Sequence, residues 1–368
     1  MALLYKQDWE EAKERYLAWW AHEAFGRCAI SVTAPKDAAP PKHGADPIVE
    51  PECPPTPEER WTDLDYISAV VENRLSRTYF GGEAFPTWQP GYPGNKQLAV
   101  FLGCPITLDF DTGWVDPILT GGDIEYQSLD LDDEEPHLKF TFSALERAAR
   151  EAKGKSIPSI GAFGGSGDTL AALRGAERLL YDLMDRPDQV RAADQHLMAI
   201  WCRLYDRFLA IITDAAEGST CWFPLWSPGK FYAAQNDFSY MIAPQTFRDV
   251  FIPTLEQQTN FLDHTVYHVD GKGAFAHVDA LCELPRLQAL QILPGAGQPG
   301  PLHFMPVLKK VQAAGKNLHI DLRPDEVETA LSELSARGLF IATSCDTEAD
   351  ARALLKNAEK WSKDRNVS

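Results

Sequence analysis

Apolar positions follow two periods along this chain, and these periods predict which segments are strands and which are helices. Short apolar runs rich in β-branched residues predict strands. These runs are 27–35, 156–163, 221–225, 265–269, 287–293, 317–322 and 339–344. A spacing of three or four between apolar positions predicts helices at 5–25, 61–78, 141–153, 171–215, 244–262, 273–282, 301–314, 324–336 and 347–361.

Strands and helices alternate regularly from about residue 140, which is typical of a parallel sheet covered by helices. We therefore predict an α/β fold, a single distorted (β/α)8 TIM-type barrel over residues 1–368, with an open doubly wound sheet as the alternative. Residues 1–60 are expected to add an N-terminal helix, strand and loop. Residues 80–122 are rich in Gly, Pro and aromatic residues and are expected to form a lid or a structural cap.

Polar residues gather at the carboxyl ends of the late predicted strands, where barrel enzymes carry their chemistry. His268 and Asp270 end one strand, and Cys345 follows the last one. Residues two apart on a strand point to the same side, so His268 and Asp270 can reach one point. Asp237 and Asp270 are the predicted catalytic residues.

His268, Asp270 and Cys345 form a candidate metal site. Zinc accepts imidazole, carboxylate and thiolate ligands, and a catalytic zinc has three protein ligands and one open position. The alternative is an ordinary histidine, an aspartate that caps a turn before Gly271, and a buried structural thiol. The spacing contains no compact metal motif, so it leaves both interpretations open.

Other residues near the strand ends receive simpler predictions. We expect substrate contacts from Trp226, Tyr267, Gln291 and His319. The glycine-rich segment 164–167 lacks the lysine of a phosphate-binding loop, so it is expected to be a tight turn. Asp168 is expected to cap the helix that follows.

The net charge of the chain limits the classes of partner that we expect. The formal net charge is −18, which repels the phosphates of nucleic acids and of anionic membranes, so neither is an expected partner. The seven cysteines are odd in number and widely spaced, which favours free thiols in a reducing compartment. No signal peptide or membrane span is evident, and we expect a cytoplasmic protein that acts on a small molecule.

At residues 267–271 the chain resembles the uroporphyrinogen decarboxylase superfamily, in particular its cobalamin-dependent methyltransferase-like branch. The run His268-Val-Asp-Gly271 is similar to the His-x-Cys-Gly pattern of that family, and Cys345 falls where its second cysteine does. The resemblance extends from about residue 60 to 361. Further matching segments are Leu173-Arg-Gly175, Leu179-Leu180, Arg186-Pro187, Asp237-Phe-Ser239, Ala243-Pro244, Phe247 and Pro253.

The resemblance implies a distorted (β/α)8 barrel and a zinc role for His268 and Cys345. In that branch, zinc activates a thiol that takes a methyl group from a corrinoid. Asp270 stands in place of the cysteine, and this harder ligand puts a thiol acceptor in doubt. The corrinoid is expected free or on a partner protein, since this chain has no Asp-x-His-x-x-Gly run. The Arg-Gln-Ala-Gly-Arg-Tyr signature of the true decarboxylases is also absent, which argues against porphyrin chemistry.

Three functions follow from these observations. The first is a zinc-dependent methyltransferase that moves a methyl group between a small substrate and a corrinoid. The second is a decarboxylase, lyase or hydrolase on a small, sugar-like substrate, with Asp237 and Asp270 as its acid and base. The third is a non-catalytic barrel that binds a small molecule. Fold alone does not separate them, because barrels host unrelated chemistries.

Overall fold

The structure is a computed structural model that describes residues 2–37, 50–89, 91 and 96–365. The strands are β1 (Ala29–Pro35), β2 (Thr78–Gly82), β3 (Thr87–Trp88), β4 (Ile106–Leu108), β5 (Gly113–Val115), β6 (Ile157–Pro158), β7 (Phe231–Gln235), β8 (His264–Asp270), β9 (Ala289–Leu293), β10 (Asn317–Asp321) and β11 (Leu339–Ser344). The α-helices are α1 (Trp9–Trp20), α2 (Pro57–Thr62), α3 (Leu64–Arg77), α4 (Gln97–Phe101), α5 (Pro136–Ala152), α6 (Ser166–Arg174), α7 (Ala176–Asp185), α8 (Pro187–Ala216), α9 (Pro244–Thr246), α10 (Ile252–Phe261), α11 (Val278–Cys282), α12 (Met305–Ala313), α13 (Val327–Glu333) and α14 (Glu348–Trp361). None of the helices within these ranges combines the length and the apolar character that a membrane crossing requires.

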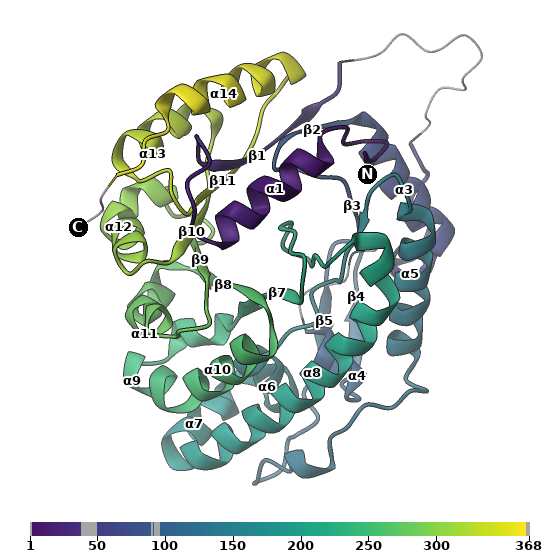
Figure 1. The fold of residues 1–368 in the computed structure, drawn as a ribbon. Helices are drawn as coiled ribbons and strands as arrows, with labels where there is room; N and C mark the ends of the chain where they lie inside the picture. Colours follow the sequence, from purple (N-terminus) through teal and green to yellow (C-terminus); the bar gives the residue numbers. More distant parts are fainter. Residues whose placement is uncertain (1, 38–49, 90, 92–95, 366–368) are drawn as a thin grey trace.

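A mostly parallel sheet organises the molecule, with helices around it (Figure 1). Its order is β2-β1-β11-β10-β9-β8-β7, and β2–β1 is its antiparallel pair. A second parallel pair joins β3 and β6, and an isolated parallel bridge joins Ile160 to Cys221. This α/β arrangement agrees with the predicted TIM-type fold. Among the described residues, the segment after β6 is joined to the segment before β7 by this isolated parallel bridge and not by a ladder, so closure of an eight-stranded barrel stays a prediction.

Helix α1 covers the amino-terminal ends of the sheet strands. Trp20 packs on Phe231 and His264, the first residues of β7 and β8, at ring-centroid distances of 5.4 and 4.6 Å. The Trp19 indole N–H donates to the Gly338 carbonyl just before β11, at 3.0 Å. Because aromatic side chains bury a large apolar area, this packing holds α1 firmly over that end. The carboxyl ends of the strands therefore form the accessible face.

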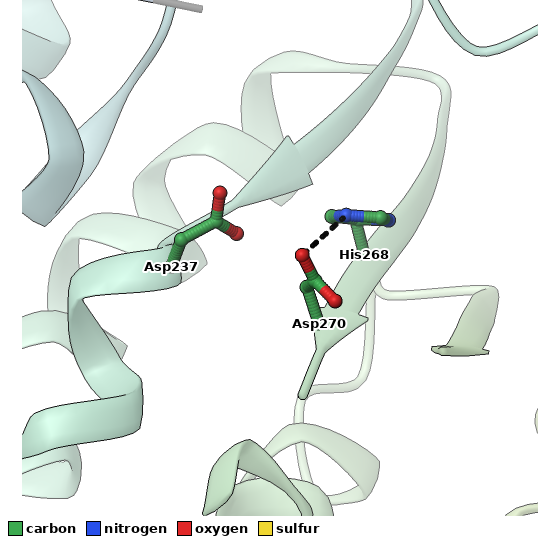
Figure 2. A group of neighbouring side chains, drawn as sticks. All are labelled: Asp237, His268 and Asp270. Atoms are coloured by element: carbon green, nitrogen blue, oxygen red, sulfur yellow. Dashed lines mark ion pairs between the residues drawn. The ribbon is translucent and has the colours of Figure 1, made fainter. Parts of the chain in front are cut away.

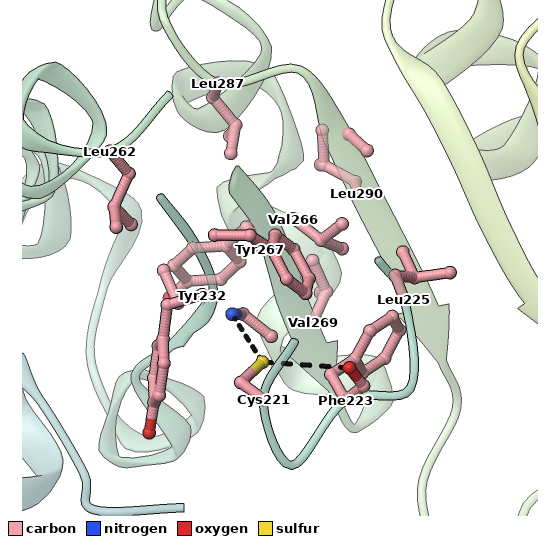
Figure 3. Close-up of a cluster of buried hydrophobic side chains, with 14 of the residues drawn as sticks. Cys221, Phe223, Leu225, Tyr232, Leu262, Val266, Tyr267, Val269, Leu287 and Leu290 are labelled. Atoms are coloured by element: carbon pink, nitrogen blue, oxygen red, sulfur yellow. Dashed lines mark hydrogen bonds between the residues drawn. The ribbon is translucent and has the colours of Figure 1, made fainter. Parts of the chain in front are cut away.

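The prediction of a strand at 221–225 is wrong. The strand in this part of the chain is β7, which begins at Phe231, six residues after Leu225. The Cys221–Leu225 segment is an irregular loop that packs its apolar side chains against the core beside β8 (Figure 3). The Cys221 thiol holds it in place, donating to the Phe223 carbonyl at 3.7 Å and accepting from the Ala233 N–H at 3.4 Å. The apolar run thus reflects burial and not extended pairing.

Three other expectations are revised in part. Strand β1 does not belong to a separate N-terminal extension of the fold, because it pairs with β11 and β2 inside the main sheet. The helical region 171–215 is divided among α6, α7 and α8, with breaks at Gly175 (φ 85°) and before Pro187. In the segment 80–122, helix α4 is fully buried and belongs to the core. A lid role stays a prediction for the β4–β5 hairpin, whose Trp114 is exposed.

Candidate functional site

The candidate site lies where β7 and β8 end side by side. In the parallel register Gln235 pairs with His268, so Asp237, two residues past Gln235, falls beside Asp270. Asp237 begins a short 3-10 helix (Asp237–Met241) that turns the chain at this point. Figure 2 shows the three side chains converging from the two chain segments.

Asp237, His268 and Asp270 each offer a ligand atom, and these atoms all lie within 4.8 Å of one another. The His268 Nε2 atom is 4.0 Å from Asp270 Oδ2, with the His268 side chain 12% and the Asp270 side chain 38% exposed. Zinc–nitrogen and zinc–oxygen bonds are each about 2.0–2.2 Å long, so one ion can touch both atoms. Two carboxylates and an imidazole are a donor set that divalent zinc accepts.

Gln291 on β9 fixes the orientation and tautomer of the His268 ring. The Gln291 amide Nε2 donates to Asp321 Oδ2 at 2.6 Å, which directs its carbonyl oxygen to His268 Nδ1. Since a carbonyl oxygen only accepts, Nδ1 donates its proton to Gln291, and Nε2 is the ring nitrogen that faces Asp270. A histidine that ligates a metal commonly donates its other N–H in this way.

Asp168 braces the turn that carries Asp237. Its buried carboxylate accepts from the Asp237 and Phe238 backbone N–H groups at 3.0 and 2.8 Å, and from the Gln235 amide at 3.2 Å. Burial raises the pKa of Asp168, and these hydrogen bonds oppose the rise. The prediction that Asp168 caps a helix is therefore wrong. It lies inside α6, whose N-cap is Gly165, and bonds to a segment about 70 residues away.

Cys345 is not a member of the converging group within the described residues. It follows β11, and β9 and β10 lie between that strand and β8. Its backbone N–H donates to the Thr33 carbonyl at 2.8 Å, on the far side of β11 from His268. Burial raises the pKa of the Cys345 thiol. Its role as a metal ligand stays a prediction, and Asp237 occupies the third position in the geometry.

The four predicted substrate contacts lie in different surroundings. Gln291 supports His268, as described above. Trp226 is buried against Trp9 and Tyr16 of α1 and donates to the Ala216 carbonyl at 3.0 Å, an arrangement typical of a core residue. Tyr267 is buried and, as the neighbour of His268 on the strand, points to the opposite side of the sheet. Substrate contacts for these two residues stay predictions that their packing does not favour.

His319 lies inside the site region but has an apolar environment. It is buried between Phe340 and Phe223, with ring-centroid distances of 5.1 and 4.7 Å. Burial lowers its pKa to about 4, so the ring is neutral at pH 7. A neutral, desolvated imidazole suits recognition of an uncharged polar atom better than proton transfer at neutral pH.

Trp222 is a site residue that the sequence did not single out. Its indole stands edge-on to the His268 ring at 5.3 Å between centroids. Trp222 also lines a cavity of about 380 Å³, and a second cavity of about 320 Å³ is lined by Asp237, Asp270 and Lys272 at the candidate metal group. Only the position of Trp222 in an apolar run was available as a signal, and that run was assigned to a strand.

One solved structure that this chain resembles is described as a methyltransferase from Methanosarcina mazei. The two chains share 12% sequence identity with a TM-score of 0.62, and the similarity covers 95% of this chain and 98% of the other. At this identity the likeness shows a common fold. Neither a protein-family model nor a curated protein matches the sequence.

Proposed function

We propose that this chain is a zinc-dependent methyltransferase of the uroporphyrinogen decarboxylase-like superfamily. It would move a methyl group between a small substrate and a corrinoid carried by a partner protein. The observation that carries the proposal is the convergence of Asp237, His268 and Asp270 at the ends of β7 and β8. The fold shared with a methyltransferase and the His-x-Asp-Gly run at 268–271 support it.

In this proposal His268 Nε2 and the carboxylates of Asp237 and Asp270 hold Zn²⁺. The bound metal supplies a Lewis acid that activates a methyl acceptor or polarises a methoxy donor. The protein contributes orientation, because Gln291 keeps His268 in the ligating tautomer and Asp168 holds the backbone of Asp237. Donor groups held in advance need no reorganisation when substrate arrives.

Metal content of untagged protein, purified without added metal and measured by mass spectrometry, tests the proposal. We expect about one zinc per chain in the wild type and loss of zinc in His268→Ala, because the central ligand is removed. His303→Ala is the matched control, since His303 is exposed and outside the group. A wild type without metal, or a His268→Ala variant with full zinc, would contradict the metal assignment.

Corrinoid use requires its own measurement. Wild-type protein mixed with free methylcobalamin and a set of thiol acceptors, or with reduced cobalamin and methoxy donors, should change the cobalamin absorbance. The change should disappear in His268→Ala and persist in His303→Ala. Zinc binding without any methyl transfer across both sets of substrates would argue against the corrinoid half of the proposal.

A metal-free hydrolase or lyase is the second candidate, favoured by the closeness of two carboxylates. Oxygen atoms of Asp237 and Asp270 lie within 4.8 Å, near the separation of carboxyl pairs in retaining glycosidases, about 5–5.5 Å. In that case Asp237 acts in proton transfer. This candidate predicts activity that survives chelation of metal and needs no corrinoid, the opposite of the first.

A further inference from the structure

A cavity near the candidate metal group is lined by aromatic side chains, neutral polar side chains and an arginine. It measures about 380 Å³, which is within the range for small-molecule sites. Its walls include the aromatic side chains of Phe80, Phe85 and Trp222, and among the described lining residues Arg74 is the charged one. The local charge at this cavity is therefore positive, although the net charge of the chain is −18.

Arg74 projects from α3 and stands between two hollows. It lines this cavity and also a neighbouring one of about 260 Å³, with Gln89 as a second shared residue. Its guanidinium donates to the Thr87 carbonyl at 2.8 Å and forms no ion pair within the described residues. Arg174, by contrast, is held by Asp182 at 2.6 Å. A guanidinium has five N–H donors, so Arg74 retains donors for a ligand.

The cavity adjoins the metal group through one side chain. Trp222 lines the cavity, and its ring is edge-on to His268 at 5.3 Å. Ser31 and Thr33 of β1 line the same cavity. Across the sheet, Ser31 pairs with Ala342, which pairs with Asp321, so these residues share one face. His319, two residues before Asp321, is on that face, and so is His268, because both pair with Gln291. A molecule seated here would have one end near Arg74 and the other near Trp222, whose ring lies beside that of His268.

We propose that Arg74 binds the carboxylate of an aromatic acid that is the small substrate of this site. The aromatic walls of Phe80, Phe85 and Trp222 would contact the ring, and the hydroxyls of Ser31 and Thr33 would accept or donate hydrogen bonds at its edge. One guanidinium balances one negative charge, which favours a carboxylate over a phosphate dianion. The inference rests on the proposed function, because it names the substrate class of that site.

Titration calorimetry with benzoate and benzamide as probes tests the assignment. The two probes share a shape and differ in charge, so wild-type protein should bind benzoate at least 10-fold more tightly. Arg74→Gln should weaken benzoate binding about 10- to 100-fold, because a charge-assisted hydrogen bond is lost. Arg74→Lys should restore part of the affinity, and Arg77→Gln, three positions on in α3 and outside the lining, should leave it unchanged.

Several outcomes would overturn the inference. These are equal binding of benzoate and benzamide, tighter binding of phenyl phosphate than of benzoate, no benzoate binding at millimolar concentration, or wild-type affinity in Arg74→Gln. Melting temperatures of the variants exclude loss of folding as the cause. The titration needs neither metal nor corrinoid, so its failure leaves the zinc measurement intact as a test of the proposed function. Absence of zinc would likewise leave the benzoate result standing.

Discussion

The carboxylate of Glu83 and the carboxylate pair of Asp237 and Asp270 have opposite surroundings in this protein. Glu83, just after β2, is completely buried and accepts hydrogen bonds from Arg15, from both terminal nitrogens of Arg27 at 2.8 Å and from the Ile30 N–H at 2.6 Å. Burial opposes its ionisation, but Arg27 and Arg15 outweigh that effect and the pKa of Glu83 is lowered. Asp237 and Asp270 lie at the accessible end of the sheet and converge on an imidazole.

The difference separates structural from functional charge. Cations and N–H groups surround the Glu83 carboxylate, which joins α1 to β1 and has no access to a ligand. The Asp237 and Asp270 carboxylates gather negative charge at one point, an arrangement that costs free energy unless a cation joins them. The acidic residues that matter for function are thus recognised by what surrounds them, and each prediction below tests that distinction.

The largest effect is expected from Glu83→Gln. The variant removes the carboxylate that pairs with Arg27, whose side chain is 10% exposed, and with Arg15, and loss of one partner of a buried ion pair costs about 3–5 kcal/mol. Urea denaturation measures the change in the free energy of unfolding. Glu11→Gln removes an exposed partner of the same Arg15 and should cost below about 1 kcal/mol. Equal losses in the two variants would refute a structural role for Glu83.

A pH-dependent effect is expected from Asp194→Asn. Asp194 is fully buried on α8 beside Ser166, and burial raises its pKa to about 7. The folded state therefore binds this proton more tightly than the unfolded state, whose pKa is near 3.8. Wild-type stability should fall as the pH rises from about 4 to 7 and level off above 7, by up to about 4 kcal/mol at about 1.4 kcal/mol per pKa unit.

Because asparagine has no proton to lose, Asp194→Asn should remove this part of the slope. Its stability relative to wild type should increase between pH 4 and pH 7 in urea denaturation series. Asp214→Asn, an exposed position on the same helix, serves as the control and should keep the wild-type slope. Parallel pH profiles for wild type and Asp194→Asn would show that Asp194 titrates normally.

The sequence predicted the regular part of the fold correctly. It failed where a buried loop has the same run of apolar residues as a strand. Strands β8 to β11 were assigned within one or two positions, whereas the predicted helices 273–282, 301–314 and 324–336 begin with 3-10 turns, so α11, α12 and α13 start three to five residues later than predicted. Cys221–Leu225 is apolar because a loop packs there, whereas the true strand β7 is buried at every position and shows no alternation. No local pattern distinguishes these two causes of an apolar run.

From the sequence, the convergence of site residues was predicted only where they lie close together along the chain. His268 and Asp270 are two apart on one strand, so their convergence follows from the strand itself. Asp237 joins them through the register of β7 on β8, and Asp168 through hydrogen bonds across about 70 residues. Sheet order decides that Cys345 is three strands from His268. Such long-range relations leave no trace in the spacing of residues along the chain.

A moderate effect is expected from Gln291→Leu. Leucine removes the acceptor that fixes the His268 tautomer, and loss of such a support typically costs about 10- to 100-fold in metal affinity. Competition with a zinc-sensitive dye measures the dissociation constant. Gln288→Leu, at a neighbouring position where the side chain bonds to Thr265 and Asp263 at the opposite end of the strands, should leave affinity unchanged. An unchanged affinity in Gln291→Leu would mean that His268 is not a ligand through Nε2.

The smallest effect is expected from Cys345→Ser, and it decides the composition of the metal site. Two other strands separate β11 from β8, and strands are about 4.8 Å apart, so the thiol lies outside the converging group. Zinc affinity should therefore change less than about 2-fold in Cys345→Ser, whereas Asp237→Asn should lose more than about 10-fold because a charged ligand becomes a neutral one. The reverse result would mean that metal binding draws the last strand toward His268, and the thiolate-containing ligand set implied by the family resemblance would then hold.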